Sequence, residues 1–548
     1  MSEMFTIQQV DFGVDPDKNS SCEDYSSVVG GTIAKQTHLG GADELLESGN
    51  INLPRFELGQ CQDNTTVEEL LRDQYQQELQ EEKRIMHPSP ALKILNSYGR
   101  GFTQLDGEKV KTPNYDIECT KLSGQKLSTD EILRLGGEKF IQCYSQASDE
   151  FFGLEHFYSS AVLGLPDEEV NDMELVQCLL ASAEKVGQQQ YEHASMLINL
   201  SNGSNLNRGS PVQRIVYYFF EALQEKIDRE IGGATSDDLV NNQSSDVLEA
   251  MMSPDAALIA YFQKIPFIKV SQFSAVQAII ENVGEAQKVH IIDLEIRGGT
   301  QCTVLMQGLA ARVDYPLEHL KITAIGTRSK SKIEETGKRL MSFAQSMNLP
   351  FSFNVVMVAD MLDLNEGLFE LDAGVAVAVY APYVLYTMIH RPDRLECLMR
   401  VMRNINPCVM VVIELEAKLN SPVFVNRFLE ALFFYGAFFD SLGDVMHHDE
   451  TNRMMLESIY LSQVIRNIVA AEGEERIFRH VNIKVWGAFF ARFGMVEIDL
   501  ITSSLYQAHL LLNNFACGSS CTLGIDGKSL TIGWKGAPIY SISAWKFQ

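Results

Sequence analysis

The residues around Asp293 are where a nucleotide or methyl-donor site would be expected. Asp293 ends a short β-branched run, and Gly298 and Gly299 follow a few residues later. A cofactor turn needs glycine at its first positions, because the backbone must approach the ligand there. The intervening residues 294–297 contain no glycine. The turn therefore departs from G-x-G-x-x-G, which argues against a bound nucleotide.

A nucleotide site also uses acidic residues at the ends of the second and third strands, and this sequence has few of them. An acid at the end of the second strand would bind a ribose diol, but that strand ends in Gly326-Thr327-Arg328. Asp360, after the third strand, stands where an acid could face an adenine ring. One acid after one strand is a weak signal. A retained nucleotide or methyl-donor pocket is thus the alternative interpretation, and we expect no cofactor.

Two further segments could contact phosphate. Gly527-Lys528-Ser529 resembles the end of a phosphate loop, but Thr522 occupies the position of the required first glycine. The basic segment 327–332, TRSKSK, could contact phosphate, although a solvated loop is the favoured interpretation. Neither G-x-S-x-G nor H-E-x-x-H occurs. We therefore expect no catalytic residues.

The histidines and paired cysteines also have ordinary explanations. His290 lies inside an apolar strand, which favours a hydrogen-bonded core histidine. His447 and His448 lie in a polar loop and are expected to be solvated. Cys517 and Cys521 have no second Cys or His pair at zinc spacing, so we expect no metal site.

The composition and charge of the chain restrict the classes of protein to which it can belong. The chain has 548 residues, 45% of them hydrophobic, and a net charge of −27. It has room for several domains and a large core, and no apolar run long enough for a membrane helix. Phosphate-backbone binding depends on Lys and Arg, so this acidic chain is expected to be a poor unaided DNA binder and to reach DNA indirectly. Direct DNA binding, through a basic face that folding gathers from dispersed Lys and Arg, is the alternative. The scattered cysteines suit a reducing compartment, and the start of the chain does not resemble a secretion signal, which predicts a soluble, non-secreted protein.

The first part of the chain differs from the rest. Residues 1–120 hold 21 Asp and Glu against 10 Lys and Arg, in polar runs rich in Gly and Ser. Such a composition buries too little apolar surface to offset chain entropy, so residues 1–125 are expected to form a disordered acidic arm. Thr66 and Glu69 form a capping box before a helix over 68–84, either a docking helix or an exposed transient one. Ser128 and Glu131 form a second capping box, before a helix over 128–145.

The periodicity changes along the remaining chain. Apolar residues at helical spacing predict helices over 173–200, 212–231 and 253–286. Strands then alternate with helices, at 289–293, 321–326, 351–360, 371–381 and 408–416. This alternation predicts a parallel, doubly wound sheet. Asp526-Gly527 between two alternating runs predicts a terminal antiparallel hairpin. The fold class is therefore α/β, with a Rossmann-like, methyltransferase-like core sheet closed by a hairpin and covered by a helical cap.

Six motifs in a fixed order resemble the GRAS family of plant transcriptional regulators. A VHIID motif is formed by Val289, His290, Ile291, Ile292 and Asp293, and Gly299 and Gln301 fit the G-x-Q that follows it in the family. The other matching segments are the first leucine-rich region (175–186 and 210–223), PFIKVSQFSAVQAI (266–279), the second leucine-rich region (381–442), a PFYRE-like region (467–486) and GWKGAPIYSISAW (533–545). The resemblance covers about residues 170–547.

The resemblance also has departures. Cys302-Thr303 replace the family's Trp-Pro, and Gln463-Val464 replace its Arg-Glu. Phe478 stands where the family has Glu. The segment DELLES (43–48) lacks the pattern that surrounds the DELLA regulatory segment, so the subgroup is not assigned.

The resemblance implies a domain order. It consists of the arm (1–125), a helical lead-in (126–168) and a GRAS domain (169–547). Within the GRAS domain, the helical cap spans about 169–285 and the α/β core about 286–547.

The resemblance further implies a function without catalysis. The protein would act through other GRAS proteins and DNA-binding transcription factors, as a homodimer or heterodimer, in the nucleus and with the cytoplasm as a second location. Leu175, Leu179 and Val186 form one apolar stripe on the first leucine-rich helix and are the candidate partner-binding residues. In the terminal SAW motif, Trp534, Ser543, Ala544 and Trp545 are expected to have a structural role.

Overall fold

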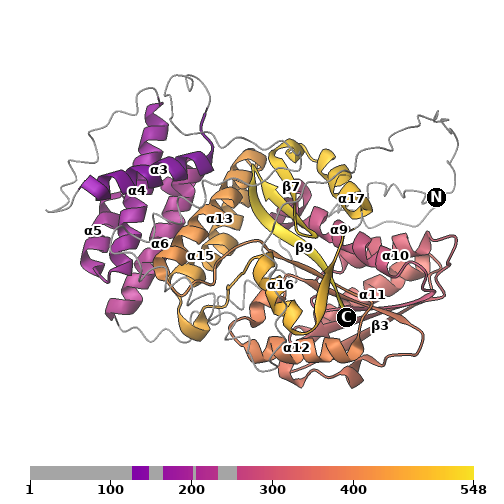
Figure 1. Cartoon of the computed structure of the whole chain (residues 1–548). Coiled ribbons are helices and arrows are strands. Elements are labelled where there is room, and N and C mark those ends of the chain that lie inside the picture. Colours follow the sequence, from indigo (N-terminus) through magenta and orange to yellow (C-terminus); the bar gives the residue numbers. More distant parts are fainter. Residues whose placement is uncertain (1–125, 147–164, 202–204, 233–255, 501) are drawn as a thin grey trace, which may run out of the picture. The chain divides into compact units, whose positions relative to one another are not determined.

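The computed structural model describes residues 126–146, 165–201, 205–232, 256–500 and 502–548. The arm at 1–125, the helix predicted over 68–84 and the DELLES segment lie outside the described residues. The described part is a mixed α/β structure, with a helical bundle at one end and a sheet covered by helices at the other (Figure 1).

A single sheet organises the second half of the chain. Its strands lie in the order β3-β2-β1-β4-β5-β9-β8-β7, and β6 pairs with β9 beside this path. Strands β1 to β5 are parallel to their neighbours, and β9 joins β5 antiparallel. The strand bounds are β1 Lys288–Asp293, β2 His319–Gly326, β3 Phe351–Met357, β4 Ala376–Pro382, β5 Val409–Leu415, β6 Met495–Ile498, β7 Cys521–Asp526, β8 Ser529–Trp534 and β9 Ala537–Phe547. The predicted doubly wound sheet and its terminal hairpin, β7–β8, are confirmed.

Helices cover both faces of this sheet. Helix α10 connects β1 to β2 and α11 connects β2 to β3, whereas α12 connects β4 to β5 in the opposite direction along the sheet. Since parallel crossovers are right-handed, opposite directions place α12 on the face that α10 and α11 leave open. The bounds are α9 Phe267–Asn282, α10 Thr300–Ala310, α11 Lys330–Ser346, α12 Pro392–Ile405, α16 Ile483–Arg492 and α17 Thr502–Asn513. Helices α10 and α17 pack against α9.

The bundle at the other end combines two distant parts of the chain. Helices α3, α4, α5 and α6 precede the sheet, whereas α13 and α15 come after its five parallel strands, and both pack on α6. The bounds are α3 Thr129–Gln146, α4 Asp167–Gly187, α5 Tyr191–Ser201, α6 Pro211–Gly232, α8 Ala256–Lys264, α13 Phe424–Val445, α14 Glu450–Met455 and α15 Ser462–Val469, with a π-helical turn, η6, at Leu456–Leu461. The division into a cap at about 169–285 and a core at about 286–547 remains a prediction, and helices from both ranges build this bundle.

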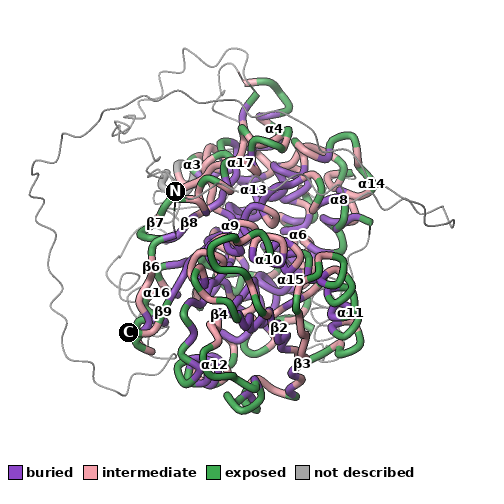
Figure 2. Tube along the Cα trace, turned by 90° about the vertical axis from the view of Figure 1, so that its right-hand side faces the viewer, coloured by how far each residue is buried: buried purple, intermediate pink, exposed green. Residues whose placement is uncertain are grey.

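Helix α13 connects the bundle to the sheet. It contacts α3, α4, α6 and α15 on one side and β8 and β9 on the other. Its residues from Arg427 to Leu442 are buried almost without interruption, and Figure 2 shows the helix deep among other buried segments. Phe428 meets Phe219 of α6 with ring centroids 5.2 Å apart. A helix that is apolar on all sides is expected to be enclosed on all sides.

Two predicted helices are each divided in the structure. The segment predicted as one helix over 173–200 ends at Gly187 and resumes at Tyr191, and Gln189 between them has a positive φ of 60°. The segment predicted over 253–286 ends at Lys264 and resumes at Phe267, beside Pro266. Proline lacks an N–H and clashes with the preceding turn, so a continuous helix is disfavoured there. Continuous apolar spacing concealed both breaks.

The capping box at the start of α3 forms as predicted. The backbone N of Ser128 donates to Glu131 Oε2 at 2.7 Å, and the backbone N of Glu131 donates to Ser128 Oγ at 3.3 Å. This reciprocal pair satisfies N–H groups that the first helical turn leaves without partners.

Candidate functional site at the carboxyl ends of the strands

The turn after β1 is filled by the protein's own side chains. Leu294 and Ile296 are buried, and Arg297 has a positive φ of 48°. Gly299, with φ of 67°, precedes α10, and a Cβ there would lie 2.7 Å from Thr336 of α11. This glycine therefore permits close packing of two helices. The feature that a bound nucleotide requires, bare backbone directly after the strand, is replaced by bulky residues.

Asp293, the last residue of the VHIID motif, is fixed inside this turn. Its carboxylate accepts hydrogen bonds from the backbone N of Glu295 at 3.0 Å and from Gln301 Nε2 at 3.1 Å. Burial raises the pKa of Asp293 to about 7. The residue is 1% exposed, so its visible role is to hold the turn and the start of α10 together.

The other VHIID residues belong to the sheet core. Val289, Ile291 and Ile292 are buried. His290 is also buried, and its Nε2 lies 2.8 Å from Thr323 Oγ1 on β2. Burial lowers the pKa of His290 to about 4, so the ring is neutral at physiological pH. The structure thus places His290 as a hydrogen-bonded core histidine.

A buried polar cluster lies beside this turn. The guanidinium of Arg297 lies 5.3 Å from the centre of the Tyr383 ring, and Arg297 Nε lies 3.8 Å from Glu295 Oε1. Glu414 at the end of β5 accepts from the backbone N of Leu385 at 2.8 Å, and burial raises its pKa to about 8. Within the described structure, Arg297 Nε, the Tyr380 hydroxyl and Glu414 Oε2 are buried atoms without a hydrogen-bond partner. Sequence reasoning did not identify this cluster, because its members come from three separate strands.

The remaining candidates from the sequence have structural partners. Asp360 caps a short helical turn through the backbone N of Leu362 at 3.1 Å. It also accepts from Arg394 Nε at 2.8 Å. The hydrogen bond from Arg394 lowers the pKa of Asp360. His447 and His448 are exposed beside each other, and His447 Nδ1 lies 2.9 Å from the carbonyl oxygen of Asp444. In the 327–332 segment, Thr327, Arg328 and Lys330 are exposed.

The predicted partner stripe on the first leucine-rich helix is mostly internal. Leu179 and Val186 are 0% and 2% exposed, and Leu175 is half-buried. Helix α4 is enclosed by α3, α5, α6 and α13, so this face packs within the bundle. Leu179 and Val186 therefore do not form a surface for a partner, which corrects that part of the prediction.

The exposed apolar residues of this region lie on the next helix. Met196 and Leu200 of α5 are 61% and 62% exposed, one helical turn apart. Ala194 and Ile198, on the opposite side of α5, are buried. The sequence contains this signal, because α5 carries apolar residues on two opposite sides and can bury only one of them. Reading 173–200 as one helix obscured it.

The SAW residues lie inside the sheet region. Trp534, Ser543, Ala544 and Trp545 are all buried, on β8 and β9. Trp545 donates from Nε1 to Ser543 Oγ at 2.8 Å and packs against Phe490 of α16 with centroids 4.9 Å apart. Trp534 packs against Phe267 of α9, with centroids 6.1 Å apart. This placement supports the expected structural role.

The described residues contain neither a cluster of metal ligands nor a membrane-spanning helix. No three His, Cys, Asp or Glu side chains in the described ranges are placed to hold a metal ion. No helix in that part of the chain is both long and apolar enough to span a bilayer.

Comparison with known proteins defines the class. The model of the GRAS domain family matches residues 175–546. The crystal structure of SCL7 from Oryza sativa is similar, with a TM-score of 0.60 and 26% sequence identity over 68% of this chain and 99% of that chain. The chain belongs to the GRAS family, whose members are plant transcriptional regulators.

Similar sequences include DELLA proteins. DELLA protein GAI1 of Vitis vinifera is 30% identical over 386 residues, which are 70% of this chain and 63% of that protein. DELLA protein RGA of Arabidopsis thaliana is 29% identical over 387 residues, again 70% of this chain and 63% of that protein. The chain thus matches less than two thirds of the length of these relatives. The similarity lies at the level of the family, and no subgroup is assigned.

Proposed function

We propose that this chain is a transcriptional regulator that acts through protein contacts and without catalysis. Its partners are other GRAS proteins and DNA-binding transcription factors, and it reaches DNA through them. The observation that carries this proposal is the turn after β1, where Leu294, Ile296 and Arg297 stand in place of the glycines that a methyl-donor turn needs. Family membership supports the regulatory role, and the net charge of −27 supports indirect contact with DNA.

We infer that the partner surface includes the exposed face of α5. Met196 and Leu200 present two large apolar side chains one helical turn apart, the spacing of anchors in helix-mediated recognition. Helix α5 lies at the outer edge of the bundle (Figure 1), where a second helix can approach it. This surface replaces the buried residues Leu179 and Val186 as the candidate for dimerisation or partner binding.

Co-precipitation tests this surface. The full chain carrying Met196→Glu and Leu200→Glu is compared with the parent for capture of a second tagged copy of itself and of proteins from plant nuclei, identified by mass spectrometry. We expect the double variant to lose partners and to keep the parent's melting temperature, because both side chains are exposed. Ile259→Glu on α8, at a residue 45% exposed, is the matched control and should retain them. Full capture by the double variant would place the interface elsewhere.

Titration with S-adenosylmethionine tests the non-catalytic part. We expect no saturable heat at tens of micromolar, the range in which a cofactor site would be detected. Saturable binding would favour the second candidate, a ligand-binding protein. The specific observation behind that candidate is the group of buried atoms without a hydrogen-bond partner on Arg297, Tyr380 and Glu414.

We further propose a nuclear location, with the cytoplasm as a second one. Other family members and DNA-binding transcription factors would be met there. A fluorescent fusion in plant cells measures the distribution directly. Exclusion from the nucleus in every tissue expressing the fusion would contradict the proposal.

A further inference from the structure

Cys517 and Cys521 flank a single tight turn between helix α17 and strand β7. The turn is a short 3-10 helix at Gly518–Ser520, and Cys521 is the first residue of β7. The backbone N of Ser520 donates to the carbonyl oxygen of Cys517 at 3.0 Å, which holds the turn closed. A Cβ at Gly518 would lie 2.1 Å from the carbonyl oxygen of Leu512, so only glycine fits there. The local backbone therefore brings the two cysteines together.

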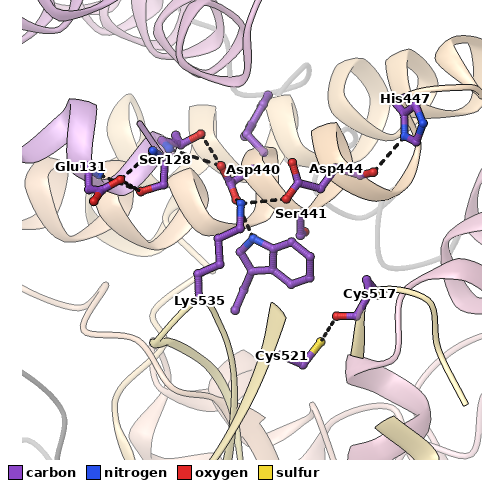
Figure 3. A network of polar contacts seen from close by, with 12 residues as sticks. Ser128, Glu131, Asp440, Ser441, Asp444, His447, Cys517, Cys521 and Lys535 are labelled. Carbon is purple, nitrogen blue, oxygen red and sulfur yellow. Dashed lines mark hydrogen bonds and ion pairs between the residues drawn. The ribbon is translucent and has the colours of Figure 1, made fainter. Parts of the chain in front are cut away.

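The Cys521 thiol faces the backbone of Cys517 across this turn. Cys521 Sγ donates to the carbonyl oxygen of Cys517 at 3.6 Å (Figure 3), and Cys517 Sγ donates to the carbonyl oxygen of Lys264 at 3.7 Å. Both cysteines are unpaired and half-buried, so a small oxidant has access to them. The other cysteines whose side chains the structure describes have no second thiol among their hydrogen-bond partners; they are Cys178, Cys302, Cys397 and Cys408.

The pKa values of the two thiols are shifted in opposite directions. A side-chain hydrogen bond with Cys521 lowers the pKa of Cys517. It raises the pKa of Cys521, with burial acting in the same direction. The thiolate is the form that attacks oxidants. The lowered pKa therefore favours Cys517 as the nucleophile and Cys521 as the resolving thiol.

We propose that Cys517 and Cys521 form a reversible dithiol–disulfide pair that responds to hydrogen peroxide. The Cys517 thiolate attacks one peroxide oxygen, the O–O bond breaks, and the products are a sulfenic acid on Cys517 and hydroxide. The Cys521 sulfur then attacks the sulfenic sulfur, forms the S–S bond and displaces hydroxide, which leaves as water with the thiol proton. The two thiols lose two electrons in total, and the peroxide accepts them. A dithiol reductant reverses the reaction by exchange.

Hydrogen bonds and ion pairs connect the turn between the two cysteines to Lys535 and, through it, to helix α13. The backbone N of Lys535 donates to the carbonyl oxygen of Ser520, inside the turn, at 2.7 Å. The Lys535 ammonium pairs with Asp440 at 2.6 Å and with Asp444 at 2.7 Å on α13. Cys521 also lies opposite Trp534 in the β7–β8 pairing. Closing an S–S bond draws the two sulfurs to about 2.0 Å. The resulting shift of the turn is expected to displace the backbone around Lys535, which is hydrogen-bonded to it.

Mass spectrometry of the full chain tests the pair. The protein is treated with a few equivalents of hydrogen peroxide, alkylated with iodoacetamide and digested with trypsin, which releases both cysteines in one peptide, 493–528. We expect this peptide to be two hydrogens lighter than the dithiol form and free of alkylation, and to regain two alkylated thiols after dithiothreitol. Cys408, which is exposed, is the internal reference. Two alkylated thiols in peptide 493–528 at a peroxide dose that already oxidises Cys408 would overturn the proposal.

Single serine variants test the two roles. In Cys521→Ser, we expect dimedone to label the sulfenic acid on Cys517, because no resolving thiol is present. In Cys517→Ser, we expect no label on Cys521. Labelling of Cys521 alone would reverse the assignment of the nucleophile and overturn that part of the proposal. Circular dichroism establishes whether each variant is folded. If a variant does not fold, the mass of peptide 493–528 from the parent protein still tests whether the disulfide forms.

Discussion

Asp440 of α13 accepts the indole N–H of Trp534 of β8, with 2.6 Å between Oδ2 and Nε1. The same carboxylate accepts from Thr129 Oγ1 at the start of α3 at 2.6 Å and pairs with the Lys535 ammonium (Figure 3). Asp440 therefore connects helix α3 of the bundle, helix α13 and the terminal hairpin β7–β8. Such a charge is stable away from water only because several donors surround it.

Trp534→Ala is expected to lower the free energy of unfolding by about 3–5 kcal/mol, because it removes a large buried ring. Trp534→Phe keeps most of the ring and removes only the N–H, so its cost should be smaller, about 1–3 kcal/mol. Urea unfolding followed by circular dichroism measures both. A Trp534→Ala variant that unfolds like the parent would show that the ring is not part of the stabilising core.

Asp440→Asn is expected to destabilise the protein at neutral pH and to matter less in acid. Burial alone would raise the pKa of Asp440, but hydrogen bonds from Lys535, Thr129 and Trp534 leave it below its ordinary value of 3.8. A depressed carboxyl pKa stabilises the fold above the unfolded pKa, and this contribution is lost as pH falls through the folded pKa. The difference in unfolding free energy between parent and variant should therefore shrink below about pH 4. A difference independent of pH would contradict an ionised Asp440.

Asp293→Asn should show the opposite dependence on pH. The pKa of Asp293 is raised by burial from 3.8 to about 7. The folded protein therefore retains a proton that the unfolded chain has lost, and the parent loses stability as pH rises from 3.8 to about 7. The variant lacks this loss, so its stability relative to the parent should increase across that interval. Thermal melts at pH 4.5 and 7.5, values chosen at about the two ends of the interval, measure the change. No relative gain at the higher pH would mean that Asp293 is already ionised in acid.

Arg214→Met is expected to cost about 3–5 kcal/mol of unfolding free energy, since it leaves a buried charge with fewer partners. Arg214 Nε lies 2.9 Å from Glu457 Oε1, and the two side chains are 4% and 0% exposed. They join α6 to the π-helical turn η6. Lys330→Met is the control, because Lys330 forms an exposed ion pair with Glu334. The two side chains are 63% and 48% exposed, respectively, and such pairs contribute about 0–1 kcal/mol to the free energy of unfolding. Equal costs for the two variants would show that burial of the Arg214 pair is unimportant.

Local chemistry allowed much of the fold to be predicted from the sequence. The alternation of strands and helices, the turn at Asp526-Gly527 and the capping box of Ser128 and Glu131 depend on residues a few positions apart. The missing glycine after Asp293 is equally local. Each GRAS motif is also a short segment, such as the five residues of VHIID. Backbone preferences and turn chemistry act over this short range, which is why these features can be recognised without a structure.

The fate of the apolar helix faces could be decided only by the tertiary structure. Leu179 and Met196 both lie in apolar helical segments, yet Leu179 is buried and Met196 is 61% exposed. The difference arises because α3, α5, α6 and α13 all pack on α4, whereas α5 packs mainly on α4 and α6. Of these neighbours, α13 lies more than two hundred residues further along the chain than α4. The bond between Thr129 and Asp440 spans 311 residues. Hydrophobicity specifies that a face is to be buried, but which face finds a partner depends on chain segments that meet only after folding.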